Sequence, residues 1–332
     1  MERRTFIKSA AAYTVLTAIA TSAIGKNLMS TGNQRTSLSS STIINTYPPF
    51  TTTVKLKGKD VKVHALSTGM VATKTNFATK HGAGALAKLN IITDKHYTNF
   101  LPIWVWLIEH PDGLIVIDTG EVTDCLNPKH LEKENAFNRY TSKHIAKFSI
   151  QQQDELNYLM ASINLKPEDV KLVLLTHLHL DHTDGLRFFQ KQEIIVGNLE
   201  YTHPYGNMPT TYPSWFNPNK VNYKNNKVEV FNQAYPVTAS EDILYITTPG
   251  HTHGHSSIIL KTDEFDIIFA GDTSYYQEQV LKGELAGANV DFKATAETYK
   301  KLLAYAGTRK TIYLPSHDPN AANRLRDRAF LV

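Results

Sequence analysis

The sequence predicts one large, layered α/β domain, and two observations support this. Short apolar runs of the kind found in buried strands alternate with helix-like segments along most of the 332-residue chain. Hydrophobic residues make up 42% of the chain and charged residues 20%, which is enough apolar material for a sizeable core. Length alone suggests about two domains. The spacing of the motifs described below favours a single domain instead.

The N-terminus has the pattern of an export signal, expected over 1–26. Three basic residues within the first eight precede a short apolar stretch and a run of small residues, and that stretch is too short to cross a bilayer. The string Arg-Arg-x-Phe-Ile-Lys resembles a twin-arginine leader, which exports folded proteins. We therefore expect an exported, periplasmic protein without a stable membrane span. Residues 27–52 are rich in Ser, Thr and Asn and are expected to form a flexible linker, which leaves 53–332 for the folded domain.

The elements of the domain follow from periodicity and turn residues. Strands are predicted at 61–66, 103–110, 114–117, 171–176, 193–196, 227–230, 243–247, 256–261, 266–270 and 311–314. Pro111-Asp112-Gly113 joins two of these strands in a hairpin. Helices are predicted over 151–164, where four apolar residues share one face, and over 293–306, where Gly307 marks the end.

Charge and cysteine content narrow the class of protein. The net charge is +4, and the body of the chain has no Lys/Arg run of the nucleic-acid-binding type, so no nucleic-acid partner is expected. Cys125 is the only cysteine, so no internal disulfide can form. The fold must then depend on its core and on any bound metals.

The strongest functional signal is the string His-Leu-His-Leu-Asp-His at 177–182, directly after the apolar run at 171–176. Residues i and i+2 of an extended backbone point to the same side, so His177 and His179 can share one metal ion. Asp181 and His182 come after the chain has begun to turn and can face a neighbouring ion. Loops at strand ends are where rigid scaffolds place functional groups.

Three further turns each present a potential ligand just past a predicted strand, beside a Gly or Pro. These ligands are His251, Asp272 and His317. Imidazole and carboxylate ligands suit zinc, manganese, iron or cobalt, and no thiolate is offered. We therefore predict a site for two divalent metal ions, with zinc as the first candidate.

These motifs resemble the metallo-β-lactamase superfamily and, within it, the N-acyl homoserine lactonase (quorum-quenching lactonase) family. The intervals of 74, 21 and 45 residues between His177, His251, Asp272 and His317 fit that family's order and approximate spacing. The resemblance covers about 55–320 and includes Ile-Asp-Thr-Gly at 117–120. It implies a four-layer αβ/βα sandwich with the metals at one edge of two packed sheets.

The resemblance also implies a role for each ligand. It assigns His177, His179 and His251 to the first metal, Asp181, His182 and His317 to the second, and Asp272 to a bridge between them. Asp118 and His255 match positions that orient ligands. Two residues depart from the family pattern. Asp184 replaces a frequent glycine and is expected to cap the next helix, and His253 replaces a proline and could touch the site without binding metal.

The implied function is hydrolysis of a lactone or a similar carboxylic ester by a hydroxide that bridges the two metals. Tyr275 stands where the lactonases carry a tyrosine that hydrogen-bonds the substrate carbonyl, and it is expected to stabilise the oxyanion. Asp181 is expected to carry a proton to the leaving alkoxide. The aromatic- and proline-rich stretch at 201–216 is expected to be a long ordered loop. It would either wall an acyl-chain pocket or pack over the sheet edge.

Several rival functions remain at this point. A phosphotriesterase-type hydrolase would use the same bimetal site for in-line attack at phosphorus. A zinc β-lactamase of this motif type would lack the bridging carboxylate of Asp272. A thioester hydrolase of the glyoxalase II type would need a helical C-terminal domain, whereas only 15 residues follow His317. A non-catalytic binding protein would be expected to have lost a ligand. The sequence leaves open the exact substrate, the native metal and the oligomeric state.

Overall fold

The computed structural model describes residues 44–223 and 228–332, which form one folded domain. The predicted export signal at 1–26 and residues 27–43 of the predicted linker lie outside the described residues. The rest of that linker is packed against the domain. The Asn45 side chain donates to the carbonyl of Ser67, and the Tyr47 ring lies edge-on to Trp104 at 5.5 Å. The first strand begins at Phe50, so the folded domain starts earlier than residue 53.

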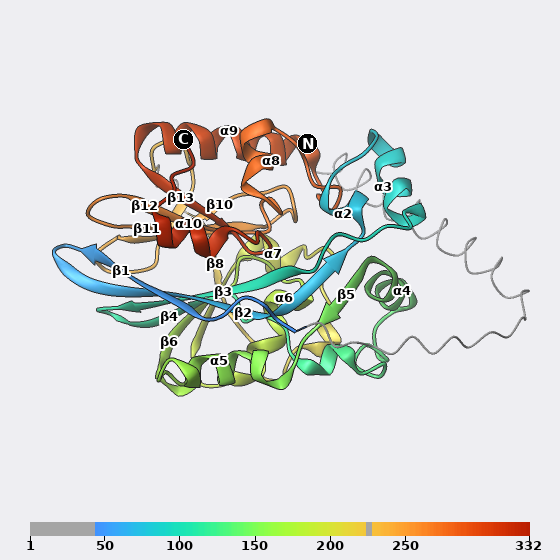
Figure 1. Ribbon diagram of the computed structural model, residues 1–332, viewed down its shortest axis with the longest axis horizontal. Helices are drawn as coiled ribbons and strands as arrows, with labels where there is room; N and C mark the ends of the chain where they lie inside the picture. Colours follow the sequence, from blue (N-terminus) through green and yellow to red (C-terminus); the bar gives the residue numbers. More distant parts are fainter. Residues whose placement is uncertain (1–43, 224–227) are drawn as a thin grey trace, which may run out of the picture.

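Two mixed β-sheets lie face to face and form the body of the domain (Figure 1). The first sheet has the order β1 (Phe50–Leu56), β2 (Lys59–Thr73), β3 (Leu101–His110), β4 (Gly113–Ile117), β6 (Val170–Leu174), β7 (Glu193–Gly197) and β8 (Asn219–Val221), and β5 (Ala146–Ser149) pairs with β2. The second sheet has the order β13 (Thr311–Pro315), β12 (Asp266–Gly271), β11 (Ser256–Lys261), β10 (Ile243–Thr247) and β9 (Ala234–Pro236).

Alternating side chains of β3 show why two layers cover the first sheet. Trp104 and Trp106 point into the core between the sheets, where Trp106 contacts Phe269 of β12. Val105 and Leu107 point to the opposite face and pack against α5 (Leu156–Ser162). Because side chains of a strand alternate between its faces, an apolar run such as that of β3 has to be buried on both sides.

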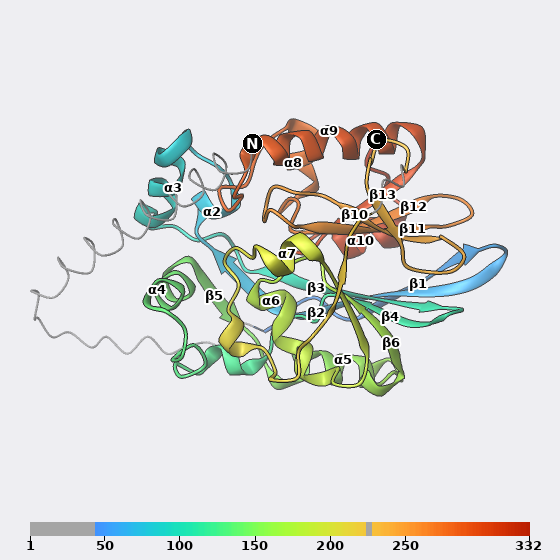
Figure 2. The ribbon, with the colours of Figure 1, turned by 180° about the vertical axis from the view of Figure 1, so that it is seen from behind.

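Helix α9 (Phe292–Thr308) covers the outer face of the second sheet through its apolar side, and α8 (Gln277–Lys282) lies beside it. Figures 1 and 2 show the resulting order of helix, sheet, sheet and helix, which confirms the predicted four-layer αβ/βα sandwich. None of the helices in the described part of the chain is long and apolar enough to span a bilayer.

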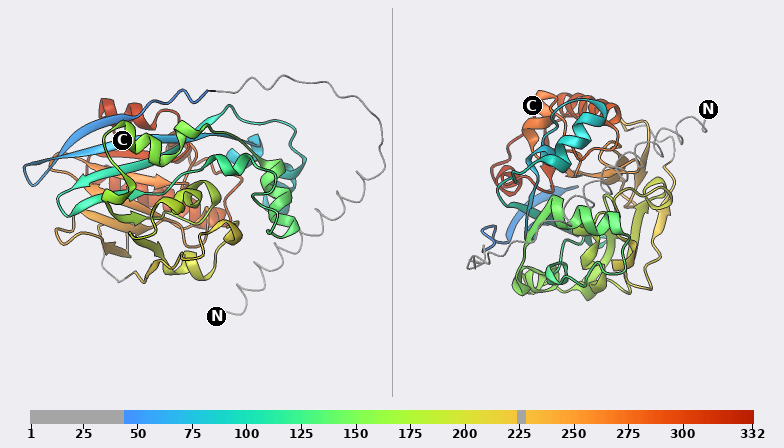
Figure 3. Two further views of the ribbon diagram at one scale, coloured as in Figure 1. Left: turned by 90° about the horizontal axis from the view of Figure 1, so that it is seen from below. Right: turned by 90° about the vertical axis from the view of Figure 1, so that its right-hand side faces the viewer.

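The remaining helices are short. They are α2 (Thr75–Ala78), α3 (Gly84–Thr93), α4 (Ala136–Ile145), α6 (Leu180–Thr183), α7 (Asn198–Thr202) and α10 (Ala321–Asp327). Helices α2, α3 and α4 gather at one end of the sandwich, beyond the end of β2 (Figures 1 and 3). Residues of α2, α3, α4 and β5 line a pocket at this end.

Most predicted strands are confirmed within a few residues, and those at 243–247 and 256–261 match β10 and β11. The predicted strand at 227–230 is wrong. Val228 and Phe231 exchange two backbone hydrogen bonds across a tight turn, and Glu229 within it has a φ of +51°. A left-handed residue at that point is incompatible with extended backbone.

The two predicted helices are present with different bounds. The segment at 151–164 begins as a 3₁₀ turn over 152–154 and continues as the shorter α5. Helix α9 runs through Gly307 and ends at Thr308, with the Arg309 amide donating to the Tyr305 carbonyl. A glycine near the end of a helix weakens it but does not oblige it to stop.

Candidate metal centre

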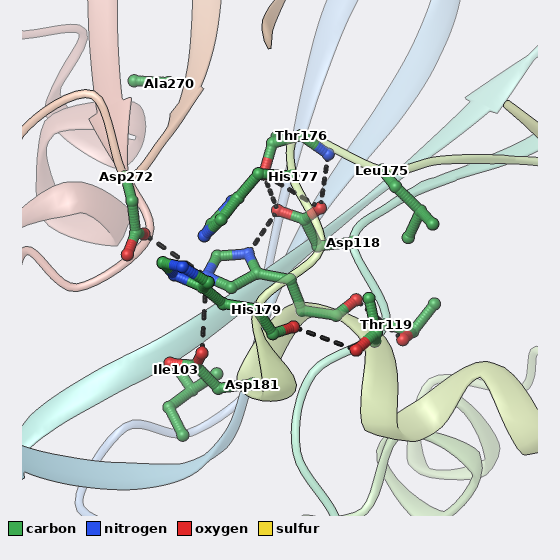
Figure 4. Close-up of polar contacts among 12 residues, drawn as sticks. Ile103, Asp118, Thr119, Leu175, Thr176, His177, His179, Asp181, Ala270 and Asp272 are labelled. Carbon is green, nitrogen blue, oxygen red and sulfur yellow. Dashed lines mark hydrogen bonds and ion pairs between the residues drawn. The ribbon is translucent and has the colours of Figure 1, made fainter. Parts of the chain in front are cut away.

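Seven His and Asp side chains from four turns meet at one edge of the two sheets. His177, His179, Asp181 and His182 follow β6, His251 follows β10, Asp272 follows β12 and His317 follows β13. All seven residues predicted as ligands are therefore brought together. Figure 4 shows Asp272 entering from the second sheet toward His177 and His179, which come from the first.

The first group consists of His177, His179, His251 and Asp272, whose candidate ligand atoms all lie within 4.8 Å of one another. His251 Nε2 lies 3.0 Å from His179 Nδ1 and 3.5 Å from Asp272 Oδ2. Three imidazoles and one carboxylate oxygen around one point are a common set of ligands for zinc and related metals.

The second group consists of Asp181, His182 and His317. His317 Nε2 lies 3.3 Å from Asp181 Oδ2 and 3.3 Å from Asp272 Oδ2. His182 Nε2 lies 3.3 Å from Asp272 Oδ1. Asp272 therefore faces both groups, which is the placement that a bridging carboxylate requires.

Buried atoms without hydrogen-bond partners show that this arrangement fits metal ions. His177 Nε2, His182 Nε2 and Asp272 Oδ1 are buried and form no hydrogen bond, although the last two lie 3.3 Å apart as an ion pair. Such orphaned polar atoms are rare in folded proteins because each one costs free energy. Here they converge within the two groups, where divalent cations would satisfy them.

The charge states of the first group suit metal binding. Burial, followed by the positive potential of neighbouring histidines, lowers the pKa of His177 well below its ordinary value. Burial also lowers the pKa of His251 well below its ordinary value, although Asp272 opposes the shift. Both rings are therefore neutral at physiological pH, and a neutral imidazole has the free lone pair that a metal requires.

The second group is held together by opposite charges when it holds no metal. Burial raises the pKa of Asp181, but His182 and His317 outweigh burial and lower it to about 2. Burial lowers the pKa of His317, but Asp272 and Asp181 outweigh burial and raise it to about 10. The carboxylates of this group thus require compensating positive charge. Protonated histidines supply that charge in the metal-free protein, and bound metal cations would replace those protons.

Three ligands are oriented through the ring nitrogen that faces away from the centre. His182 Nδ1 lies 2.8 Å from Asp118 Oδ2, His179 Nε2 donates to the Tyr205 carbonyl at 2.9 Å, and His317 Nδ1 donates to the Pro102 carbonyl at 3.0 Å. Such contacts fix the tautomer and the ring orientation of metal-binding histidines. They leave His179 Nδ1, His182 Nε2 and His317 Nε2 free to bind metal.

The backbone conformation of Asp118 places its side chain where it can orient His182. Its φ is +60°, a left-handed conformation that is uncommon for non-glycine residues. Besides His182, its carboxylate accepts the backbone amide of Thr176 at 2.7 Å and the Thr176 hydroxyl (Figure 4). Asp118 therefore connects the turn after β4 to the residue before His177.

The other residues singled out in the sequence lie near the centre but not in it. His255 Nε2 accepts the backbone amide of Asp272 at 3.0 Å, so it positions that residue through its main chain. His253 is half-buried and belongs to neither ligand group. The prediction that Asp184 caps a helix is wrong. Thr183 precedes the following 3₁₀ helix, and Asp184 Oδ2 lies 2.9 Å from His130 Nε2.

A pocket opens beside both ligand groups and is lined mainly by apolar side chains. They include Val71, Phe77, Ile91, Ile92, Phe137, Ile145, Phe148, Met208 and Ala288, with His179, Asp181, His251, Asp272 and His317 at its base. Tyr275 also lines the pocket, and its ring stacks on that of His317 with centroids 5.3 Å apart. The predicted long loop at 201–216 supplies Tyr205, Gly206 and Met208 to the wall.

Glu200 also supports the centre, and reasoning from the sequence alone missed it. It is fully buried in α7 and accepts hydrogen bonds from both turns that carry the histidines of the first ligand group. A single glutamate in Asn-Leu-Glu-Tyr-Thr has no spacing relation to the histidine motifs, so no pattern could identify it.

Comparisons with known proteins agree with this geometry. An N-acyl homoserine lactonase of Bacillus cereus is 26% identical over 218 residues, which cover 66% of this chain and 82% of the relative. The N-acyl homoserine lactonase AttM of Agrobacterium fabrum is 26% identical over 279 residues, covering 79% of this chain and 95% of AttM.

Solved structures share the fold. An N-acyl homoserine lactone hydrolase with the product N-hexanoyl-L-homoserine bound at its catalytic metal center has a TM-score of 0.64 at 21% identity, over 82% of this chain and 96% of that one. AidC, a dizinc quorum-quenching lactonase, has a TM-score of 0.56 at 17% identity, over 82% and 91% of the two chains. Residues 98–317, which include all seven converging side chains, match the profile of the Metallo-beta-lactamase superfamily. The sandwich, the ligand order and this match together show that the chain belongs to the metallo-beta-lactamase superfamily.

Proposed function

We propose that the protein is a dinuclear metal-dependent hydrolase that opens the ring of lactones of the N-acyl homoserine lactone type, with zinc as the metal. The observation that carries this proposal is the apolar pocket, whose base is formed by members of both ligand groups. A substrate with a polar ring and an aliphatic tail can place its ester at the base and its tail along the wall. The relatives named as N-acyl homoserine lactonases support the same choice.

The metals and the side chains would divide the chemistry between them. Two divalent ions, when bound, lower the pKa of a shared water so that hydroxide is available at neutral pH, and they polarise the ester carbonyl. Tyr275 would donate its phenolic proton in a hydrogen bond to the carbonyl oxygen as negative charge develops there. Burial raises the pKa of Tyr275 well above its ordinary value, so this hydroxyl keeps its proton.

Asp181 is placed to move a proton between the attacking and the leaving oxygens. It lines the pocket, and its Oδ2 lies 3.3 Å from His317 Nε2 within the second ligand group. The charges of His182 and His317 keep this carboxylate ionised. In that form it would accept the proton that hydrolysis releases. It would then return that proton to the alkoxide, and the product would be a hydroxy acid.

The wall of the pocket fits an unbranched acyl chain. The apolar residues come from β2, α2, α3, α4 and β5, so a chain that enters from the metal centre is covered on several sides. Burial of each methylene group contributes roughly 0.8 kcal/mol. We therefore expect KM to fall as the acyl chain lengthens, until the pocket is filled.

A substrate panel on purified protein tests the proposal, with metal content measured on the same sample. The panel contains N-acyl homoserine lactones of increasing chain length, a simple γ-lactone, a neutral phosphotriester and a β-lactam. We expect two metals per chain and the largest kcat/KM on a long-chain homoserine lactone. A larger kcat/KM on the phosphotriester would favour the rival hydrolase. A protein that holds two metals and cleaves none of these compounds would refute the enzymatic proposal.

We also propose that residues 1–26 direct export of the folded protein to the periplasm. The support is the arginine pair followed by a short apolar stretch. Cell fractionation of the full chain and of a double Arg3→Lys, Arg4→Lys variant tests it. Equal amounts of both proteins in the periplasmic fraction would contradict a twin-arginine route.

A further inference from the structure

Glu200 is a fully buried carboxylate that the proposed chemistry does not use. It lies in α7, which follows β7 of the first sheet, and its side chain has no solvent exposure. A buried carboxylate is unfavourable unless hydrogen bonds compensate for the loss of water. The identity of its partners therefore shows what its charge stabilises.

The partners of Glu200 come from the two turns that carry the histidines of the first ligand group. Oε1 accepts the backbone amide of Leu178 at 3.0 Å, and Leu178 lies between His177 and His179. Oε2 accepts the hydroxyl of Thr252 at 2.6 Å, and Thr252 directly follows His251. One carboxylate thus connects the turn after β6 to the turn after β10.

Close packing makes this connection stiff. The turn after β10 lies so near α7 that a Cβ added at Gly254 would be 2.1 Å from the Glu200 backbone nitrogen. Burial raises the pKa of Glu200 to about 7, while hydrogen bonds from Thr252, Leu178 and Gly254 oppose that shift. The side chain therefore has little freedom to move, and no solvent competes for its oxygens.

The geometry leads us to propose that Glu200 is a positioning residue that sets the spacing of the three histidines of the first ligand group. Covalent geometry fixes the separation of the two carboxylate oxygens of Glu200. The Leu178 amide and the Thr252 hydroxyl, which bond to those oxygens, are therefore held at a fixed separation. The histidines beside them are held with them. This inference rests on the proposed two-metal centre and predicts that the first group depends on Glu200 more than the second does.

The second group gives an internal comparison. Its histidines are supported by other partners, with His182 held by Asp118 and His317 held by the Pro102 carbonyl. Neither partner contacts Glu200 in any hydrogen bond of the described residues. A residue that merely stabilised the fold would weaken both groups alike, whereas a positioning residue should weaken only the first.

The experiment uses the full chain with two substitutions, Thr252→Val and Glu200→Gln. Thr252→Val keeps the shape of the side chain and removes the hydrogen bond from the Thr252 hydroxyl to Glu200. Glu200→Gln keeps the length and replaces the charge. Glu193→Gln is the matched control, because Glu193 lies on the preceding strand, is exposed, and accepts a hydrogen bond from the Asn219 side chain.

Zinc is titrated into each metal-free protein and followed by imidazole ¹⁵N NMR, with circular dichroism to verify the fold. His179 identifies the first group, because its Nε2 donates to the Tyr205 carbonyl and only its Nδ1 can bind zinc. His182 and His317 report the second group through Nε2. The loss of an outer hydrogen-bond partner typically weakens metal binding by 10–100-fold. In Thr252→Val we therefore expect the His179 signal to shift at a zinc concentration roughly tenfold higher than in the parent. The His182 and His317 signals should shift at the same zinc concentration as in the parent.

The proposal is overturned if both variants bind zinc in the first group as tightly as the parent and the Glu193→Gln control. It is also overturned if both groups weaken together, since that outcome indicates a general structural role. Should Glu200→Gln fail to fold, Thr252→Val decides by the same criteria. A parent protein that takes up no zinc would refute the proposed function together with this inference, whereas unchanged variants refute the inference alone.

Discussion

Replacement of Tyr275 by phenylalanine should slow lactone hydrolysis without disturbing the metal centre. The ring would keep its stacking on His317 at 5.3 Å and its edge contact with Phe77 at 6.4 Å, since only the hydroxyl is removed. The hydroxyl would otherwise donate to a developing oxyanion, and a hydrogen bond to a charged group contributes about 1.5–3 kcal/mol. Because each 1.36 kcal/mol is a factor of ten in rate, kcat/KM should fall roughly 10- to 150-fold.

The assay is steady-state hydrolysis of one long-chain N-acyl homoserine lactone, with metal content measured on each preparation. Most of the loss should be in kcat, because the bond strengthens as charge develops in the transition state. Tyr276→Phe is the matched control, since Tyr276 is the next residue along the chain and does not line the pocket. A kcat/KM for Tyr275→Phe within twofold of the parent, at equal metal content, would refute the proposed role.

Three further substitutions test other parts of the molecule. Asp272→Asn should reduce the metal content below two per chain and lower lactone hydrolysis by more than about a hundredfold. The reason is that even the loss of a hydrogen-bond partner of a metal ligand typically costs 10–100-fold. Two metals per chain in the variant, measured by mass spectrometry, would contradict this prediction. Ala288→Leu fills part of the pocket wall and should shift preference toward shorter acyl chains by about tenfold in relative kcat/KM, whereas an unchanged chain-length profile would place the acyl chain elsewhere. Asp94→Asn should lower the melting temperature at neutral pH, because hydrogen bonds from Thr75, Asn76 and His96 outweigh burial and lower the Asp94 pKa from 3.8 to about 2. A depressed pKa stabilises the fold above about pH 4 and this contribution is lost as pH falls toward 2, so the difference in melting temperature between parent and variant should shrink over that range.

The accuracy of the strand predictions follows from how each strand is buried. The apolar runs of β10 and β11 are buried along almost their whole length, so their sequence limits and their structural limits coincide. The segment predicted at 227–230 has the composition of a strand, but its described part, 228–230, lies in a turn with a left-handed residue. A short alternation of polar and apolar residues does not reveal whether a neighbouring strand is available to pair with it.

The site was easier to predict than its support. The ligands are grouped in short strings directly after buried strands, and imidazole and carboxylate groups at such spacing have few structural uses. Glu200 contacts the same turns from α7, yet its position in the sequence carries no relation to theirs. Only the three-dimensional fold brings β7 and its helix beside the ends of β6 and β10.

Asp184 shows why a local rule failed two residues from a ligand. An aspartate between two helical segments is favoured as a cap when water or a free backbone amide is its best partner. Here the side chain is buried instead, with His130 Nε2 at 2.9 Å from its Oδ2. Burial and the nearby Asp184 raise the pKa of Glu121 well above its ordinary value, which favours a neutral Glu121. A histidine and a glutamate more than fifty residues earlier in the chain therefore decided the contacts of Asp184, and its immediate neighbours could not have indicated them.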